Sequence, residues 1–201
     1  MNSKFFEYIE PTKIPYLEIG NRLGFPNNKI PDSNLEKIDE LIDRLKKIWN
    51  PKAVIKTSKV KEIEKDRIIT EDLILPGEKA IEVLKNSKMI SFFAATLGEK
   101  AATLLKDLKE NLTEYFFLDA IESEIIEQII EELNLMINKT AMLQGYKTTR
   151  RISPGYLDIP LSFQKTLLEY LDNKKLGITI NEKYIMYPEK SITAILGWIK
   201  Q

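Results

Sequence analysis

The sequence contains no cysteine and no histidine. Without cysteine, the chain cannot form disulfides, thiolate metal sites or iron–sulfur clusters, and it has no thiol nucleophile. Without histidine, it cannot form a Ser-His-Asp triad, use imidazole as a general base, or ligate zinc, haem or cobalt through imidazole. We therefore predict no metal site and no catalytic residue of these kinds on this chain.

The sequence also lacks a net charge and a long hydrophobic run. Lysine and arginine together number 30, as do aspartate and glutamate, so no overall field attracts a phosphate backbone or a membrane surface. No apolar segment approaches the roughly 20 residues that span a bilayer. The N-terminus has no basic segment followed by an apolar core. We expect a cytoplasmic protein that binds neither nucleic acid nor membranes.

What is present is typical of one globular domain. The chain has 201 residues, of which 43% are hydrophobic, and a single core can bury about two thirds of the unfolded surface at this size. The sequence has no internal repeat, and it has no glycine-rich motif of the kind that binds dinucleotides or nucleoside triphosphates. We predict a single domain over residues 1–201.

The spacing of apolar residues predicts both helices and strands. Helical spacing occurs at about 15–25, at 32–48 beginning at Asp32 or Ser33, at 75–87 with Pro76 near the first turn, and at 99–111, 112–136 and 160–173. Strand patterns occur at 5–11 as an edge strand or arm, at 53–75 as two antiparallel strands, at 88–98, and at 175–199 as two or three short strands. Pro188, within the last segment, indicates either a hairpin turn or a functional loop. The predicted class is α+β, with a mostly antiparallel twisted sheet flanked by helices.

The segment at residues 150–160, "RRISPGYLDIP", carries the most specific local pattern. Pro154 fixes φ near −65° and Gly155 tolerates a positive φ, which is the pairing that a type II turn requires. Such a turn can leave the backbone N–H groups of Gly155 and Tyr156 free for a ligand. Arg151 can offer a bidentate fork to a carboxylate, and Tyr156 offers a flat face. The local sequence alone favours a plain turn with solvated arginines, so the ligand-binding interpretation needs further support.

That support comes from a family resemblance. Arg151 to Tyr156, "RISPGY", resembles the Arg-x-x-x-Gly-Tyr signature of the activation, or reactivation, domain of cobalamin-dependent methionine synthase. "LGITINE" at 176–182 and "MYPEKSITA" at 186–194 are similar to later segments of that family, and "LDAIESEIIEQIIEEL" at 118–133 is similar to its long helix. The resemblance covers about residues 90–201, and residues 1–90 carry no recognised motif.

The resemblance implies a binding site for S-adenosylmethionine. It implies that Arg151 pairs with the methionyl carboxylate, that the backbone of Ser153, Pro154, Gly155, Tyr156 and Leu157 contacts the adenosine, and that Tyr156 stacks on the ligand or closes the pocket. Asp119 and Glu127 occupy matching acidic positions and could offset the sulfonium charge. A solvated acidic helix face is an open alternative for both acids.

The resemblance also implies partners. In that family, a methyl group from S-adenosylmethionine and an electron from a reductase or flavodoxin restore methylcobalamin from cob(II)alamin. A chain without histidine lacks the cobalt-ligating histidine of the cobalamin-binding domains. We therefore expect the cobalamin to be carried by a separate methionine synthase chain, with this chain as a methyltransferase subunit that is not active alone.

Two other interpretations remain open at this point. In the first, the chain is a non-catalytic module that binds or chaperones a corrinoid protein and has lost the S-adenosylmethionine site. In the second, the chain is an unrelated structural protein whose turn matches the signature by chance.

Overall fold

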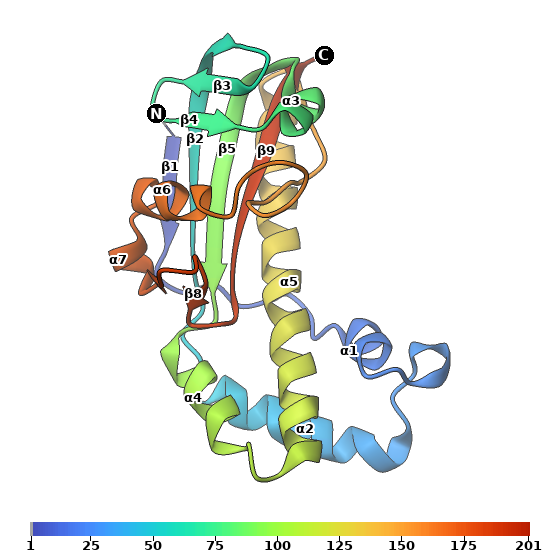
Figure 1. Ribbon diagram of the computed structural model, residues 1–201. Coiled ribbons are helices and arrows are strands. Elements are labelled where there is room, and N and C mark those ends of the chain that lie inside the picture. Colours follow the sequence, from blue (N-terminus) through green and yellow to red (C-terminus); the bar gives the residue numbers. More distant parts are fainter. Residues whose placement is uncertain (1) are drawn as a thin grey trace.

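The computed structural model describes residues 2–201, and its centre is a twisted antiparallel sheet with helices on both faces (Figure 1). The strand order is β4-β3-β2-β5-β9-β6. Strand β1 stands outside this linear order and also pairs with β2. The seven strands are β1 (Asn2–Phe6), β2 (Lys52–Ile63), β3 (Arg67–Thr70), β4 (Ile74–Pro76), β5 (Ser87–Thr96), β6 (Tyr146–Thr148) and β9 (Ser191–Lys200). The predicted α+β class with a mostly antiparallel sheet is confirmed.

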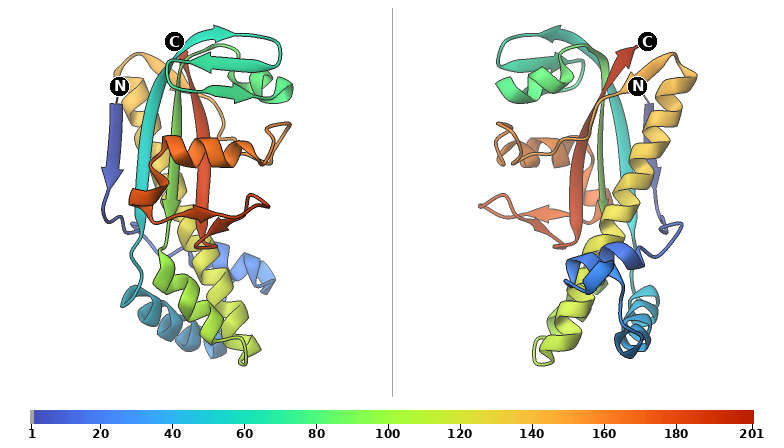
Figure 2. Two further views of the ribbon diagram at one scale, coloured as in Figure 1. Left: turned by 60° about the vertical axis from the view of Figure 1, so that its left-hand side comes forward. Right: turned by 90° about the vertical axis from the view of Figure 1, so that its right-hand side faces the viewer.

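The helices divide between the two faces of the sheet. The right view of Figure 2 shows the sheet nearly edge-on, with the long helix α5 (Leu112–Leu143) on one side and α3 (Glu78–Leu84) and α6 (Phe163–Tyr170) on the other. The remaining helices are α1 (Tyr16–Arg22), the 3₁₀ helix η1 (Pro26–Asn28), α2 (Asp32–Lys46), α4 (Glu99–Asp107) and α7 (Asn173–Leu176). Two short strands, β7 (Thr179–Ile180) and β8 (Met186–Tyr187), form a separate small sheet.

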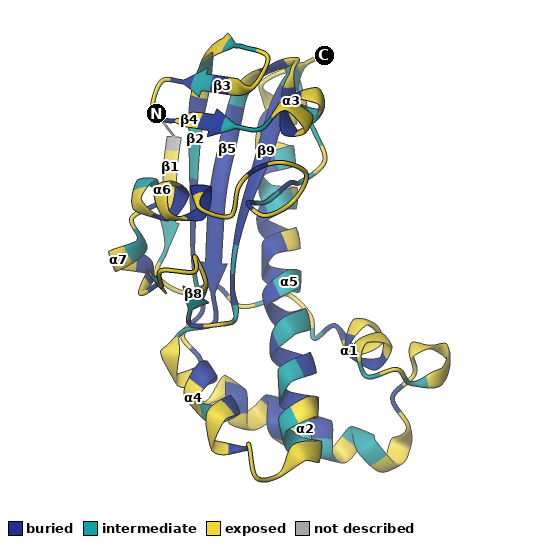
Figure 3. Cartoon of the chain, viewed as in Figure 1, coloured by how far each residue is buried: buried dark blue, intermediate teal, exposed yellow. Residues whose placement is uncertain are grey.

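Strand β5 lies in the middle of the sheet and is covered on both faces. Phe93 and Ala95 belong to the hydrophobic cluster on the α5 side, whereas Phe92 and Ala94 belong to the cluster on the α3 and α6 side. All four side chains are fully buried, as the dark blue strands of Figure 3 show. A strand that is buried on both faces reads as a continuous apolar run rather than an alternating one, which is why residues 88–98 predicted a buried strand.

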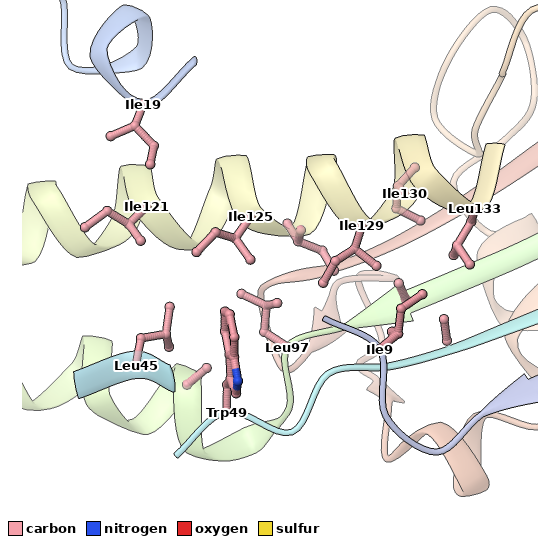
Figure 4. Packing of buried hydrophobic residues seen from close by; sticks show 14 of the residues in the cluster. Ile9, Ile19, Leu45, Trp49, Leu97, Ile121, Ile125, Ile129, Ile130 and Leu133 are labelled. Atoms are coloured by element: carbon pink, nitrogen blue, oxygen red, sulfur yellow. The ribbon is translucent and has the colours of Figure 1, made fainter. Parts of the chain in front are cut away.

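Helix α5 is the principal partner of the sheet on its own side. Its residues Ile121, Ile125 and Ile129 follow one another at intervals of four, so they lie on one face, and Figure 4 shows them packing toward Trp49 and Leu97. The helix runs seven residues beyond the predicted end at about 136. The reason is that buried residues continue on this face as far as Ala141, while the next glycine, Gly145, has a positive φ of 79°.

Several predicted boundaries are wrong, for physical reasons that involve tertiary contacts. Pro76 lies two residues before α3, near the first turn as predicted, but it also ends β4, a third strand that was not predicted, where it pairs with Arg67. An edge strand tolerates proline because the missing N–H faces no partner. Helix α6 begins at Phe163 rather than Pro160, because the N–H groups of residues 163–165 bond to carbonyls three residues back.

The C-terminal region also differs from the short strands expected there. Strand β9 has ten residues and pairs along its length with β5, whereas β8 pairs with β7. Pro188 therefore connects two different sheets and is not the turn of a hairpin. None of the helices within residues 2–201 combines the length and the apolar character needed to span a bilayer.

Candidate functional site

The 150–160 loop forms the predicted type II turn. The N–H of Tyr156 donates to the carbonyl of Ser153 at 3.1 Å, and Gly155, at the third position, has φ of 86°. Ile152 holds the start of the loop to the sheet, since it exchanges two backbone hydrogen bonds with Ile195 of β9. The loop thereby lies against β9, between α3 and α6 (Figure 1).

The turn does not leave its N–H groups free, and that part of the prediction is wrong. The N–H of Gly155 donates to the carbonyl of Ile159 at 2.9 Å, and the N–H of Tyr156 is used within the turn. The chain folds back through a second turn, in which Leu157 has φ of 55° and the N–H of Ile159 donates to Tyr156. A bond to a residue four positions later cannot be read from the Pro-Gly pattern.

Asp158 fixes the loop to α3, a contact that the sequence did not reveal. Its carboxylate accepts hydrogen bonds from the backbone N–H groups of Lys79 at 2.8 Å and Ala80 at 3.1 Å. These are groups in the first turn of α3 that have no intrahelical partner. The hydrogen bond from Lys79 is the main cause that lowers the pKa of Asp158. The loop is thus held at the sheet by Ile152 and at α3 by Asp158.

Arg151 is paired with Glu127 of α5 but keeps part of its guanidinium unsatisfied. Its Nη2 donates to Oε2 of Glu127 at 2.8 Å. Its Nη1 is buried and has no hydrogen-bond partner. A buried donor without a partner costs about 1–3 kcal/mol, and more when it is charged. The arrangement therefore orients the guanidinium and leaves one of its nitrogens without a hydrogen-bond partner.

A cavity of about 530 Å³ lies next to this guanidinium. It is lined by Glu127 of α5, by the 150–160 loop, by Gln164 of α6, by Met186 of β8 and by the first residues of β9. Of the residues predicted for the site, those at the cavity are Glu127, Arg151, Ser153, Pro154, Tyr156 and Leu157. This volume falls in the range of about 300–1,000 Å³ that is typical of small-molecule sites.

Two predicted residues do not line the cavity. Gly155 supplies the positive φ of the turn, and an added Cβ there would meet the side chain of Leu161 at 3.3 Å. Asp119 lies eight residues before Glu127, which is about 12 Å along the helix. Lys190 donates to Asp119 at 2.5 Å and to Ser123 at 2.9 Å. The carboxylate of Asp119 is therefore already paired with a lysine from the chain itself.

The cavity residues that the sequence interpretation did not assign to the site include Gln164 and Thr193. Gln164 is only 6% exposed, and its Oε1 accepts from the hydroxyl of Thr193 at 3.3 Å. A signal was present, because Gln164 stands three, four and seven residues before Leu167, Leu168 and Leu171 and so lies on the apolar face of its helix. A polar residue at such a position calls for a partner.

Comparison with known proteins gives one kind of match. A scan against protein-family models finds none, and a search of curated proteins also finds none. Among solved structures, the crystal structure of the MetH reactivation domain bound to AdoHcy (S-adenosylhomocysteine) is similar, with a TM-score of 0.69 and 14% sequence identity. The superposition covers 98% of this chain and 78% of that chain, so it includes most of residues 1–90, where the sequence has no motif. This chain therefore has the fold of the MetH reactivation domain.

Proposed function

We propose that the chain binds S-adenosylmethionine in the cavity beside Arg151 and supports the reductive remethylation of cob(II)alamin carried by a separate methionine synthase chain. One observation carries the proposal: Arg151 lines a cavity, and one of its guanidinium nitrogens is buried without a hydrogen-bond partner. The fold adds weight, because the similar solved structure is described as bound to AdoHcy. AdoHcy has the same amino-acid and nucleoside parts as S-adenosylmethionine and lacks the transferable methyl group.

Arg151 fits the role of carboxylate ligand. Glu127 holds Nη2, so the side chain is oriented before a ligand arrives and less conformational entropy is lost on binding. A ligand carboxylate at Nη1 would satisfy the unpaired donor through a charge-assisted hydrogen bond, about twice as strong as a neutral one. The carboxylate of Glu127 stays close enough to offset a positive charge on the ligand.

The other residues of the chain would bind and orient the ligand. Tyr156 is 72% exposed at the rim of the cavity, where its ring can cover a bound ligand. Bound S-adenosylmethionine supplies an electrophilic methyl group, so the chain has to hold that group in position and needs no acid or base. A chain without histidine and cysteine can therefore perform this role.

The rim of the cavity offers a surface for the cobalamin-carrying chain. Tyr156, Leu157 and Leu161 of the 150–160 loop and its continuation are exposed, as are Tyr184 and Ile185 in the segment before β8. The carbonyl of Tyr184 lies 3.5 Å from Nε2 of the cavity residue Gln164, which places the segment before β8 next to the cavity. Exposed apolar side chains gathered beside a cavity are typical of interaction sites. We propose that a reductase or flavodoxin binds transiently to the resulting complex.

Titration calorimetry with S-adenosylmethionine tests the binding proposal. Wild-type protein should give saturable heat, and Arg151→Ala should weaken binding about 10- to 100-fold, since a hydrogen bond to a charged group contributes about 1.5–3 kcal/mol. Arg67→Ala is the matched control, because Arg67 also pairs with a glutamate, Glu64, but lies away from the cavity. This variant should bind as wild type does.

A flat titration of the wild-type protein would overturn the proposal. If the same preparation then bound a cobalamin-loaded methionine synthase chain in a pull-down, the non-catalytic corrinoid-protein-binding module would be the better interpretation. If it bound neither the ligand nor that chain, both functions would be wrong, and a structural protein on the same fold would remain.

A further inference from the structure

One edge of β9 is open where it borders the cavity. Ile195 exchanges backbone hydrogen bonds with Ile152, at 2.8 and 3.1 Å. On the same side, the carbonyl of Gly197 accepts from the N–H of Thr149, and the N–H of Gly197 donates to the side-chain Oγ1 of Thr149. Alternate residues of a strand direct their backbone groups to the same side, so the N–H and C=O of Thr193 also face away from β5. Strand β6 pairs only with residues 198–200 of β9. Within residues 2–201, no strand pairs with this edge at Thr193.

Thr193 is nevertheless buried, with 2% of its surface exposed, and it lines the cavity. Buried backbone groups are nearly always hydrogen-bonded, since leaving one unpaired costs free energy. A strand edge at the wall of a cavity presents one donor and one acceptor, close together and fixed in direction. Such a pair is suited to a neutral group that both donates and accepts, such as the edge of a nucleobase.

Gln164 adds a second donor and acceptor beside this edge. Its Oε1 accepts from the Thr193 hydroxyl, while its Nε2 reaches only the carbonyl of Tyr184 at 3.5 Å. This separation is well beyond the usual N–H···O distance of about 2.9 Å. The amide is therefore oriented by Thr193 and retains donor capacity at a cavity that it lines.

The two sets of polar groups at the cavity differ in charge. Arg151 and Glu127 are charged and suit the amino-acid end of the ligand, whereas Gln164 and Thr193 are neutral. Met186 and Ile192 add apolar surface that can face a flat ring. We infer that Gln164 and the backbone edge of Thr193 bind the nucleoside part of the ligand, through its base edge or ribose hydroxyls. This inference rests on the proposed function.

The direct test is nuclear magnetic resonance of uniformly ¹⁵N-labelled wild-type protein. On addition of S-adenosylmethionine, the backbone amide of Thr193 and the side-chain amide of Gln164 should both shift, because each gains a hydrogen-bond partner. The same two signals should shift with 5′-methylthioadenosine, which has the nucleoside but no amino-acid end. This measurement needs no substitution, so a folding defect cannot obscure it.

Two variants should separate the two ends of the ligand. Gln164→Leu, which keeps the approximate shape and removes the amide, should weaken both S-adenosylmethionine and 5′-methylthioadenosine about tenfold. Arg151→Ala should weaken S-adenosylmethionine only. Gln164→Glu retains the acceptor oxygens and lacks the N–H donors, so it should behave like Gln164→Leu if the donor is what matters. Gln144→Leu, at an exposed glutamine beyond the end of α5, is the control.

Three outcomes would contradict the inference in distinguishable ways. If S-adenosylmethionine binds while the Thr193 and Gln164 signals stay in place, the inference is wrong and the proposed function stands. The same holds if Gln164→Leu weakens S-adenosylmethionine but not 5′-methylthioadenosine, because Gln164 would then serve the amino-acid end. If wild-type protein does not bind S-adenosylmethionine at all, the proposed function fails and the inference fails with it.

Discussion

At the scale of the residue, Gly155 links the conformation of the turn to the candidate site. Its φ of 86° lies in a region that costs other residues about 1–2 kcal/mol, and an added Cβ would press on Leu161 at 3.3 Å. We expect Gly155→Ala to lower the free energy of unfolding by that amount. We also expect it to weaken S-adenosylmethionine binding, because the turn follows directly after Arg151.

The measurements are denaturant unfolding and calorimetric titration of the same preparations. Gly24→Ala is the matched control, since Gly24 also has a positive φ, of 73°, but has nothing within 4 Å of an added Cβ and lies far from the loop in the sequence. It should lose stability and keep its ligand affinity. Unchanged affinity in Gly155→Ala would mean that the turn does not position the ligand-binding groups.

The residues of the candidate site could be predicted only in part. Arg151 and Glu127 were both identified from the sequence, and the structure joins them at 2.8 Å. The pairing of Asp119 with Lys190 was not predicted, because Lys190 is 71 residues away along the chain. A motif shows which side chains a segment carries, but it does not show which of them the rest of the chain has already paired.

At the scale of the element, α5 carries a buried carboxyl group that should make stability depend on pH. Glu122 is fully buried, and neither of its carboxyl oxygens has a hydrogen-bond partner. Burial raises the pKa of Glu122 to about 8; the positive charge of Lys190 opposes this shift, and the negative charges of Asp119 and Glu189 reinforce it. In the folded protein, the helix therefore holds this residue in its neutral form near pH 7.

The sign of the pH effect follows from the raised pKa. An unfolded chain releases this proton near pH 4.5, whereas the folded chain keeps it until about pH 8. Across that window the free energy of unfolding falls as pH rises, by about 1.4 kcal/mol per pH unit at most. Below the window the effect disappears, and above it the loss of stability is constant.

Substitution of Glu122 by glutamine tests this expectation. Denaturant unfolding of Glu122→Gln between about pH 5.5 and about pH 7.5 should show less loss of stability with rising pH than wild type, because no proton is exchanged at this position. Glu131→Gln, at an exposed glutamate of the same helix, should keep the wild-type slope. Equal slopes in Glu122→Gln and wild type would show that the carboxyl group titrates near its ordinary pKa.

Elements with a long stretch of buried apolar residues could be predicted well from the sequence, and elements of only three or four residues could not. The pattern in β5 and α5 comes from burial over ten or more residues, so each was placed correctly and only the end of α5 was missed. Strand β4 has three residues and α7 has four, too few for a period to show. They exist because neighbouring elements cover them, which is a property of the tertiary structure.

At the scale of the whole molecule, one sheet serves two hydrophobic cores. The cluster on the α5 side includes Leu45, and the cluster on the other side includes Leu168. Both side chains are almost completely buried. Because the central strands contribute to both clusters, neither core can remain when the sheet is lost. We therefore expect residues 1–201 to unfold as a single cooperative domain.

Leu45→Ala and Leu168→Ala test this cooperativity from opposite faces of the sheet. Each should lower the free energy of unfolding by about 2–5 kcal/mol, as large-to-small substitutions in cores do.

Trp49 and Trp198 both lie in the cluster on the α5 side, so tryptophan fluorescence reports on that core alone, whereas circular dichroism reports on all helices and strands. In a single domain, the two signals should change together in both variants, even though Leu168 lies in the core without tryptophan. A Leu168→Ala protein in which the circular dichroism changes before the fluorescence would instead show that the two faces unfold separately and that the sheet does not couple them.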